Sequence, residues 1–310
     1  KKENDSFLKL QELCDDIGHR LSGSPELDKA IEWAQLSMKN DGQENVQAEA
    51  VTIRKWVRGE ESCELLQPRP MKINMLGLGW SIGTPADGIT AEVISVKSKS
   101  ELDALSDEDI QGKIVLFDYP MAMYSETDGA GYGDAVQYRS NGASWAAQRG
   151  GVAALVRSVT AYSLDSPHTG AMRYDAEVKK IPAAAISVES AMMISRLQKR
   201  GKKCVVKLIM NAKDMGEAPS ANVIAEIVGT EKPEEIVLIG GHIDSWDVGQ
   251  GAQDDGAGCV AAMEAINILR KLGLKPKRTI RVVLWTNEEN GLAGARSYAA
   301  RHQNDDHVAG

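Results

Sequence analysis

The sequence has no apolar stretch long enough to cross a membrane, because no run approaches the roughly 18–20 residues that a spanning helix needs. Its N-terminus, KKENDSFLKL, also has no apolar core of the kind found in a signal peptide. Positive charge is scarce: 36 Lys and Arg stand against 44 Asp and Glu, which gives a formal net charge of −8 at pH 7. This balance argues against nucleic acid or an anionic membrane as a partner, because both bind basic surfaces.

The cysteines form no metal-binding or disulfide pattern. None of the four is part of a CxxC motif or of a Cys/His spacing typical of zinc. A chain of 310 residues, 43% hydrophobic and 26% charged, can bury a sufficient core without disulfides. We therefore predict mostly buried free thiols at Cys14, Cys63, Cys204 and Cys259.

The N-terminal part of the chain predicts two helices and a strand. Apolar residues recur at helical spacing over residues 7–17, and Ser24-Pro25 is a typical start for a second helix over residues 25–39. Residues 45–56 then alternate as a strand does. A Gly- and Pro-rich segment, residues 77–88, follows and suggests a domain boundary.

Three segments follow from these patterns. Residues 1–86 form the first part of an α/β domain, residues 87–214 form an inserted β-rich domain, and residues 215–310 return to the first domain. In the last segment, strand 236–240, helix 258–273 and strand 278–286 make a β-loop-α-β unit, which implies parallel strands. The predicted fold class is α/β, with a mostly parallel mixed sheet between helices.

The loop from Gly240 to Gly258 contains one His and four Asp but neither Lys nor Arg. It could be a solvated surface loop, or the missing positive charge could be a metal ion. Acids also follow the next strand, and the carboxyl ends of parallel strands meet at one edge of a sheet. The side chains expected to converge there are His242, Asp244, Asp254, Asp255, Glu288 and Glu289.

These residue types suit a hydrolytic metal site. His and carboxylates are ordinary zinc ligands, and one carboxylate can bridge two ions. Asp244 could orient the ring of His242, and adjacent glutamates can face the metal and the attacking water separately. An HxD pair alone is more often structural, and an EE pair is usually solvated, so the combination carries the prediction. Asp255 could instead be a turn residue, and Asp247 a hydrogen-bonding partner of the loop.

Several longer motifs resemble one family. GHIDSWDVGQGAQDDGAG, LGLKPKRTIRVVLWTNEENG, SPHTG, RLSGS, RGEESCELLQP and GLGWSIGTPADGITAEV are similar to the co-catalytic zinc aminopeptidase and glutamate carboxypeptidase clan of metallopeptidases. The inserted segment, with GKIVLFD and NGASWAAQRGGVAALV, resembles a protease-associated domain. Together these motifs span nearly the whole chain.

The resemblance implies a site with two Zn²⁺ ions. It makes His242 a ligand of one metal, Asp254 the bridging ligand and Glu289 a ligand of the second metal. Glu288 becomes the general base, and Asp244 the residue that orients the His ring. A cis peptide bond between Asp254 and Asp255 is also expected. His168, in SPHTG, either contacts substrate or is a structural loop residue.

The activity implied is hydrolysis of dipeptides or short peptides by an exopeptidase. An aminopeptidase acting on longer peptides is one alternative, and a metal-free scaffold or receptor ectodomain is the other. The resemblance further implies a homodimer and a secreted, periplasmic or lysosomal location.

In such enzymes the remaining ligands, an Asp and a His, follow the glutamate pair along the chain. His302 and His307 come too early for that His, so we expect a fragment of a longer enzyme that by itself binds metal weakly.

Overall fold

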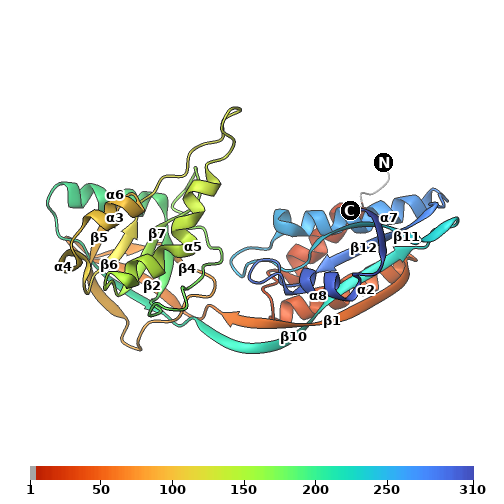
Figure 1. The fold of residues 1–310 in the computed structure, drawn as a ribbon, viewed down its shortest axis with the longest axis horizontal. Helices are drawn as coiled ribbons and strands as arrows, with labels where there is room; N and C mark the ends of the chain where they lie inside the picture. The colour runs from red at the N-terminus through yellow and green to blue at the C-terminus, as the bar shows by residue number, and fades with distance from the viewer. Residues whose placement is uncertain (1–4) are drawn as a thin grey trace. The chain divides into compact units, whose positions relative to one another are not determined.

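The computed structural model describes residues 5–310. The chain forms two compact units (Figure 1). The first unit combines the residues up to Lys55 with Met215–Gly310, and the second is Trp56–Asp214. The first unit is therefore discontinuous in sequence, and it contains both loops of the predicted metal site.

The first unit is built on a five-stranded mixed sheet. Its strand order is β1-β10-β12-β11-β13, and β11 runs parallel to both β12 and β13, whereas β10 is antiparallel to β12. The predicted α/β class with a mixed sheet is confirmed. The strands are β1 (Glu44–Val57), β10 (Lys213–Ile227), β11 (Lys232–His242), β12 (Arg278–Trp285) and β13 (Asp306–Ala309).

Helices cover both faces of this sheet because both faces are apolar. Successive strand residues point to opposite faces. Val282 and Leu284 join a core with three helical segments, whereas Val283 between them packs with Tyr298 on the other side. The first face carries α1 (Asp5–Gln11) continuing into the π-helix η1 (Glu12–Ile17), α2 (Pro25–Asn40) and α7 (Ala257–Lys271); the second carries α8 (Ala293–Arg301).

Helix α2 begins and packs as its sequence predicts. The hydroxyl of Ser24 accepts a hydrogen bond from the main-chain N–H of Leu27 at 3.2 Å, which satisfies one of the free N–H groups at the helix start. Its buried residues Leu27, Ile31 and Ala34 belong to the same core as strand residue Val223. The N-terminal helices therefore pack on strands that come much later in the chain.

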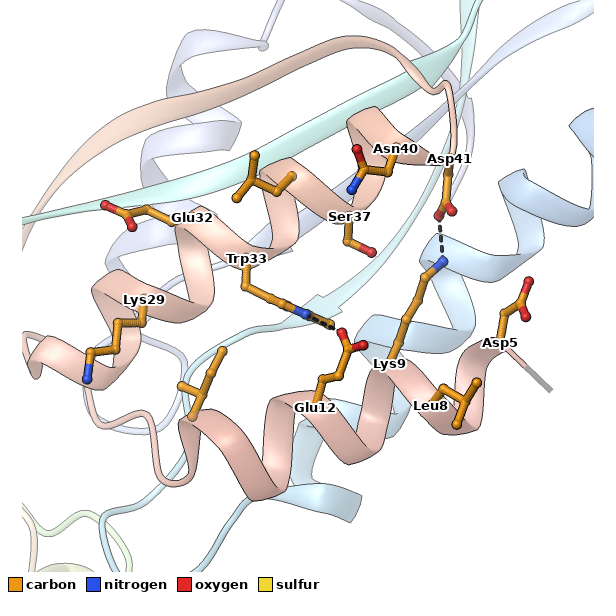
Figure 2. A pocket seen from close by; sticks show the side chains of 12 residues that line it. Asp5, Leu8, Lys9, Glu12, Lys29, Glu32, Trp33, Ser37, Asn40 and Asp41 are labelled. Carbon is orange, nitrogen blue, oxygen red and sulfur yellow. Dashed lines mark hydrogen bonds and ion pairs between the residues drawn. The ribbon is translucent and has the colours of Figure 1, made fainter. Parts of the chain in front are cut away.

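Polar contacts tie the first helices together around a cavity of about 580 Å³ (Figure 2). The indole N–H of Trp33, on α2, donates to a carboxylate oxygen of Glu12 at 3.0 Å. Lys9 on α1 donates to Asp41 at 2.5 Å and to Glu264 on α7 at 3.1 Å. These contacts join α1, η1, α2 and α7 into one layer.

The second unit contains an eight-stranded sheet in the order β3-β2-β9-β5-β6-β7-β8-β4, with β5 to β8 parallel. Its strands are β2 (Glu61–Gln67), β3 (Met71–Ile73), β4 (Met75–Gly77), β5 (Ile89–Val96), β6 (Ile114–Phe117), β7 (Ala153–Arg157), β8 (Ala183–Ile186) and β9 (Val205–Met210). Its helices are α3 (Lys99–Ala104), α4 (Asp107–Ile110), α5 (Tyr132–Gln148) and α6 (Val188–Lys199).

The two units divide between residues 55 and 56, whereas the sequence predicts a boundary after residue 86. Strand pairing explains the difference, because β2 pairs with β9 and β4 pairs with β8. The Gly- and Pro-rich segment 77–88 is a connection between β4 and β5 inside the second unit. The likeness of this unit to a protease-associated domain stays a prediction.

All four cysteines are buried and free, as predicted. Within residues 5–310, no helix combines the length and apolar character that a membrane crossing requires.

Candidate metal centre

The two loops with acidic residues begin side by side. β11 ends at His242, and His242 pairs with Trp285 at the end of β12. Because the two strands are parallel, the residues after each of them emerge at the same edge of the sheet. This is the convergence that the sequence predicts.

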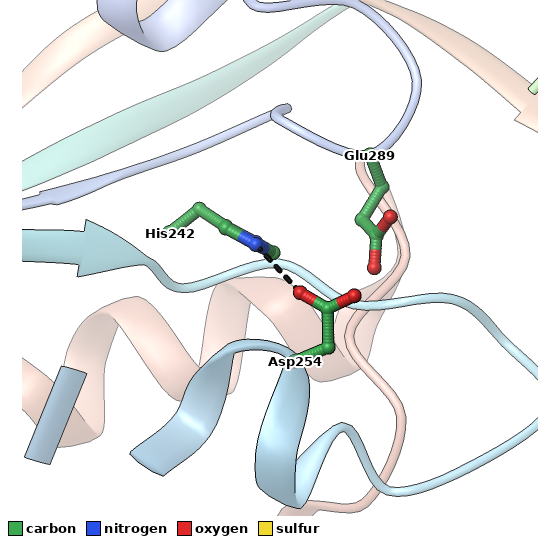
Figure 3. A group of neighbouring side chains, drawn as sticks. All are labelled: His242, Asp254 and Glu289. Atoms are coloured by element: carbon green, nitrogen blue, oxygen red, sulfur yellow. Dashed lines mark hydrogen bonds and ion pairs between the residues drawn. The ribbon is translucent and has the colours of Figure 1, made fainter. Parts of the chain in front are cut away.

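Three side chains at this edge gather their ligand atoms (Figure 3). One potential ligand atom from each of His242, Asp254 and Glu289 lies within 4.8 Å of the other two. Nε2 of His242 is 3.0 Å from a carboxylate oxygen of Asp254 and 3.9 Å from one of Glu288. One imidazole nitrogen and two carboxylates are a donor set that fits a divalent zinc ion. We call these three residues the His-Asp-Glu cluster.

Asp244 holds the main chain of the second loop. Its side chain is fully buried (0% exposed), and it accepts the main-chain N–H groups of Glu288 at 2.9 Å and Glu289 at 3.2 Å. The hydroxyl of Ser22 donates to the same carboxylate at 3.1 Å. Asp244 thereby fixes where both glutamate side chains start.

The ring of His242 contacts mainly the main chain of Asp244. Its Nδ1 lies 3.0 Å from the main-chain oxygen of Asp244 and 3.7 Å from the nearest carboxylate oxygen. A hydrogen bond to the carbonyl oxygen leaves Nε2 to face the cluster. The contact of Asp244 with the ring is thus made by its main-chain oxygen, and the orienting role of Asp244 stays a prediction.

Asp255 is not a member of the cluster, and its carboxylate organises the start of α7. Its carboxylate accepts the main-chain N–H of His242 at 3.1 Å and that of Gly258 at 3.2 Å. A Cβ atom at Gly258 would lie 2.2 Å from this carboxylate, so a side chain is excluded there. The peptide bond from Asp254 to Asp255 is cis, as the resemblance implies. Asp247 is not a member of the His-Asp-Glu cluster.

The charges of these groups shift one another's pKa values. Burial alone would lower the pKa of His242, but hydrogen bonding to Asp244 and its negative charge raise it to about 10. Burial, together with the charges of Asp254 and Asp244, raises the pKa of Glu289 to about 8. Burial also raises the pKa of Glu288, against the opposing effect of His242. Negative charge is thus crowded at this edge, as at a site that receives a cation.

A cavity of about 230 Å³ opens beside the cluster. Apolar side chains contributed by the end of β12 and by the segment that leads into α8 form much of its lining. Glu288 and His242 also border it, so a substrate group placed there would lie next to both. The lining residues are Gly241, His242, Asp255, Trp285, Thr286, Glu288, Leu292 and Ala295.

The other candidate histidines lie elsewhere. His168 belongs to the second unit, where its side chain is exposed and its main-chain N–H donates to Ser158 at 2.9 Å. His302 lies 2.8 Å from a carboxylate oxygen of Glu49, and His307 lies 3.0 Å from the hydroxyl of Tyr298. The role of His168 in substrate binding stays a prediction.

Two buried residues that contact the loops of the cluster, Arg20 and Ser22, have no sequence pattern that would single them out. Arg20 and Ser22 contact the loops of the cluster, although more than 200 positions separate them along the chain. Both belong to the motif RLSGS, whose resemblance to a family was the one signal that marked them.

The fold and the cluster together indicate a class of protein, the metal-dependent hydrolases. In this class, His and carboxylate side chains gather at the ends of parallel strands of a mixed α/β sheet. The profile described as Peptidase family M28 matches residues 222–310, and a solved peptidase M28 precursor from Shewanella amazonensis SB2B is 39% identical. That structure has a TM-score of 0.92 and covers 96% of this chain and 67% of its own. The chain belongs to peptidase family M28.

Carboxypeptidase Q of Bos taurus is 50% identical over 303 residues, which are 98% of this chain and 62% of that protein. The resemblance of the sequence motifs to this group is confirmed, and the chain spans about three fifths of the length of these curated relatives. The zinc aminopeptidase BSAP from Bacillus subtilis has the same fold, with a TM-score of 0.67 at 20% identity over 95% of this chain and 64% of its own.

Proposed function

We propose that the protein is a metal-dependent exopeptidase that hydrolyses dipeptides or short peptides. The observation that carries the proposal is the His-Asp-Glu cluster, with Glu288 beside it but outside the set of three ligands. Membership of family M28 and 50% identity to a carboxypeptidase support it. A metal-free scaffold is less consistent, because a scaffold does not need the ligand atoms of one His and two carboxylates to gather at one place.

His242, Asp254 and Glu289 would hold the metal, which we propose to be zinc. The donor set suits zinc, and a protein of the same fold is named as a zinc aminopeptidase. Zinc, when bound, supplies Lewis acidity that polarises a carbonyl group and makes water easier to deprotonate. We further propose two ions, because the carboxylate of Asp254 has two oxygens and its side chain is 67% exposed.

Glu288 acts as the general base of the proposed reaction. Its side chain lies beside the cluster and borders the apolar cavity, so it can reach both water and a bound peptide. Burial raises the pKa of its carboxyl group, which helps it to keep a proton and then pass it to the leaving amine. Asp244 keeps this base in place by accepting its main-chain N–H.

An aminopeptidase activity is the second candidate, because the fold is shared with a zinc aminopeptidase. The two activities differ in whether the substrate needs a free amino terminus. The homodimer, the peptide substrate and the secreted, periplasmic or lysosomal location implied by the resemblance stay predictions.

Zinc titration of chelator-treated protein, followed by hydrolysis assays, tests the proposal. In the complete protein we expect zinc to bind and to restore hydrolysis of dipeptides. Hydrolysis of N-acetylated substrates distinguishes a carboxypeptidase from an aminopeptidase. Asp254→Asn should weaken zinc binding. Glu234→Gln, an exposed change at the opposite end of β11, is the control and should not. A complete protein that binds no zinc after reconstitution would contradict the proposal.

A further inference from the structure

A fully buried guanidinium lies behind the metal centre. Arg20 is 0% exposed, and each of its three guanidinium nitrogens donates to a main-chain carbonyl oxygen. Nε donates to Ile243 at 2.8 Å, Nη1 to Gly18 at 2.8 Å and to Gln250 at 2.6 Å, and Nη2 to Gly251 at 3.0 Å. Burial of a charge is costly unless such hydrogen bonds compensate it. The four hydrogen bonds therefore compensate the buried charge and hold the guanidinium group of Arg20 in one orientation.

These acceptors belong to the two segments that carry the cluster. Ile243 directly follows His242, whereas Gln250 and Gly251 lie just before the π-helix η2 (Ala252–Gly256), which contains Asp254. We call residues 243–251 the ligand loop. The guanidinium group of Arg20 therefore connects both ends of the ligand loop. Through them it connects β11, which carries His242, with η2, which carries Asp254.

The main chain of Arg20 strengthens the same connection. Its N–H donates to the hydroxyl of Ser245 at 3.0 Å, and its carbonyl oxygen accepts the N–H of Ser245 at 3.1 Å. Gly251 has φ +59°, and a Cβ atom there would lie 2.4 Å from Cβ of Ser245 and 2.8 Å from Nη2 of Arg20. The ligand loop thus packs so closely on Arg20 that a side chain at residue 251 would displace either Ser245 or the guanidinium group of Arg20.

We propose that Arg20 is a positioning residue that sets the separation of His242 and Asp254, and so the affinity of the site for its metal. This inference rests on the metal-dependent function proposed above. A guanidinium is suited to this task because its N–H groups point outward in a fixed plane. A lysine at residue 20 would keep the charge, but its N–H groups all start from one nitrogen atom, so it could not reach carbonyls on both segments.

The test compares Arg20→Lys and Arg20→Met with the wild type. Zinc affinity is measured by titration of chelator-treated protein well below its melting temperature, and hydrogen exchange is followed along the chain. We expect both variants to bind zinc about 10–100 times more weakly, as is usual when partners behind metal ligands are removed. Exchange should accelerate in residues 245–254 while β12 stays protected.

Arg281→Lys is the matched control. Arg281 is a largely buried arginine of the same unit, but it pairs with the carboxylates of Glu226 at 2.6 Å and Asp305 at 2.7 Å. This variant should lower the melting temperature without weakening zinc binding. If Arg20 only stabilised the fold, its variants would also melt at a lower temperature but bind zinc as the wild type does. Folded Arg20 variants with wild-type zinc affinity would therefore overturn the proposal.

Two further measurements keep the inference testable. If Arg20→Met does not fold, Gly251→Ala disturbs the same contact from the loop side, and unchanged zinc affinity in that variant would contradict us. If the wild type binds no zinc, the proposed metal-dependent function is contradicted. The positioning role of Arg20 can still be tested by hydrogen exchange of the metal-free protein. Unchanged exchange of residues 245–254 in Arg20→Lys would then refute it.

Discussion

Glu288 and Glu289 are neighbours in sequence, but they stand in different relations to the cluster. Glu289 contributes a potential ligand atom, whereas Glu288 is outside the cluster and approaches His242 only to 3.9 Å. We predict that Glu288→Gln lowers kcat by about 10²–10⁴-fold, the usual contribution of a general base, and leaves zinc content unchanged. Glu289→Gln should instead lower zinc affinity. Zinc analysis and peptide hydrolysis of both purified variants check this, and equal loss of zinc would refute the division of roles.

Protons compete with the metal at His242 and Glu289. The pKa values of His242 and Glu289 are both raised, the first by Asp244 and the second by burial and neighbouring carboxylates, so each group holds its proton more strongly than it would in water. A ligand must lose its proton to bind zinc, so we predict that zinc affinity rises with pH between 6 and 8 and that binding releases protons. Calorimetry in buffers of different ionisation enthalpy measures that release. No proton release at pH 7 would show that these pKa values are not raised.

At the scale of elements, Lys9 links the first helix to the end of α2 and to α7. Its side chain is largely buried between Asp41 and Glu264. Lys9→Met removes the cation that pairs with the enclosed carboxylate of Asp41, whereas Glu264 keeps Lys271 at 3.7 Å. We predict a loss of roughly 1–3 kcal/mol in unfolding free energy, the usual cost of unsatisfied buried acceptors. Denaturant unfolding measures it.

The matched comparison is Lys99→Met in the second unit. Lys99 also contacts a carboxylate at 2.5 Å, that of Asp103, but this pair is exposed to solvent. Exposed pairs contribute less than about 1 kcal/mol, so this variant should change stability little. Equal losses in both variants would mean that burial of the Lys9 contacts does not matter.

The elements that carry the site could be predicted from the sequence, because each has a strong local pattern. Apolar runs specify β11 and β12, helical spacing specifies α7, and parallel pairing brings their ends together. Arg20 could not be predicted in this way, since its partners are carbonyl oxygens, which no residue type reveals. The same holds for the contact of the His242 ring with a main-chain oxygen.

The discontinuity of the first unit and the boundary after residue 214 agree with the sequence prediction, but the first boundary, at residue 55, does not. The whole molecule reveals the physical reason for this difference. Gly and Pro mark a turn whether it lies inside a domain or between domains. The strands before the turn, β2 and β4, pair with β9 and β8, which are more than 100 residues away. Pairing at such separation leaves no local pattern, so the boundary at residue 55 becomes visible only in the folded chain.

This boundary predicts which part of the chain folds alone. Residues 56–214 contain the complete eight-stranded sheet and its cores, so we expect them to unfold in a single cooperative transition when expressed by themselves. Residues 87–214 lack β2, β3 and β4, so β9 and β8 each lose one of their two partner strands, and core residues Val206 and Leu208 are uncovered. We therefore expect this shorter segment to aggregate or to melt at a clearly lower temperature. Circular dichroism and calorimetry of both segments decide between the boundaries, and a shorter segment as stable as the longer one would favour the division after residue 86.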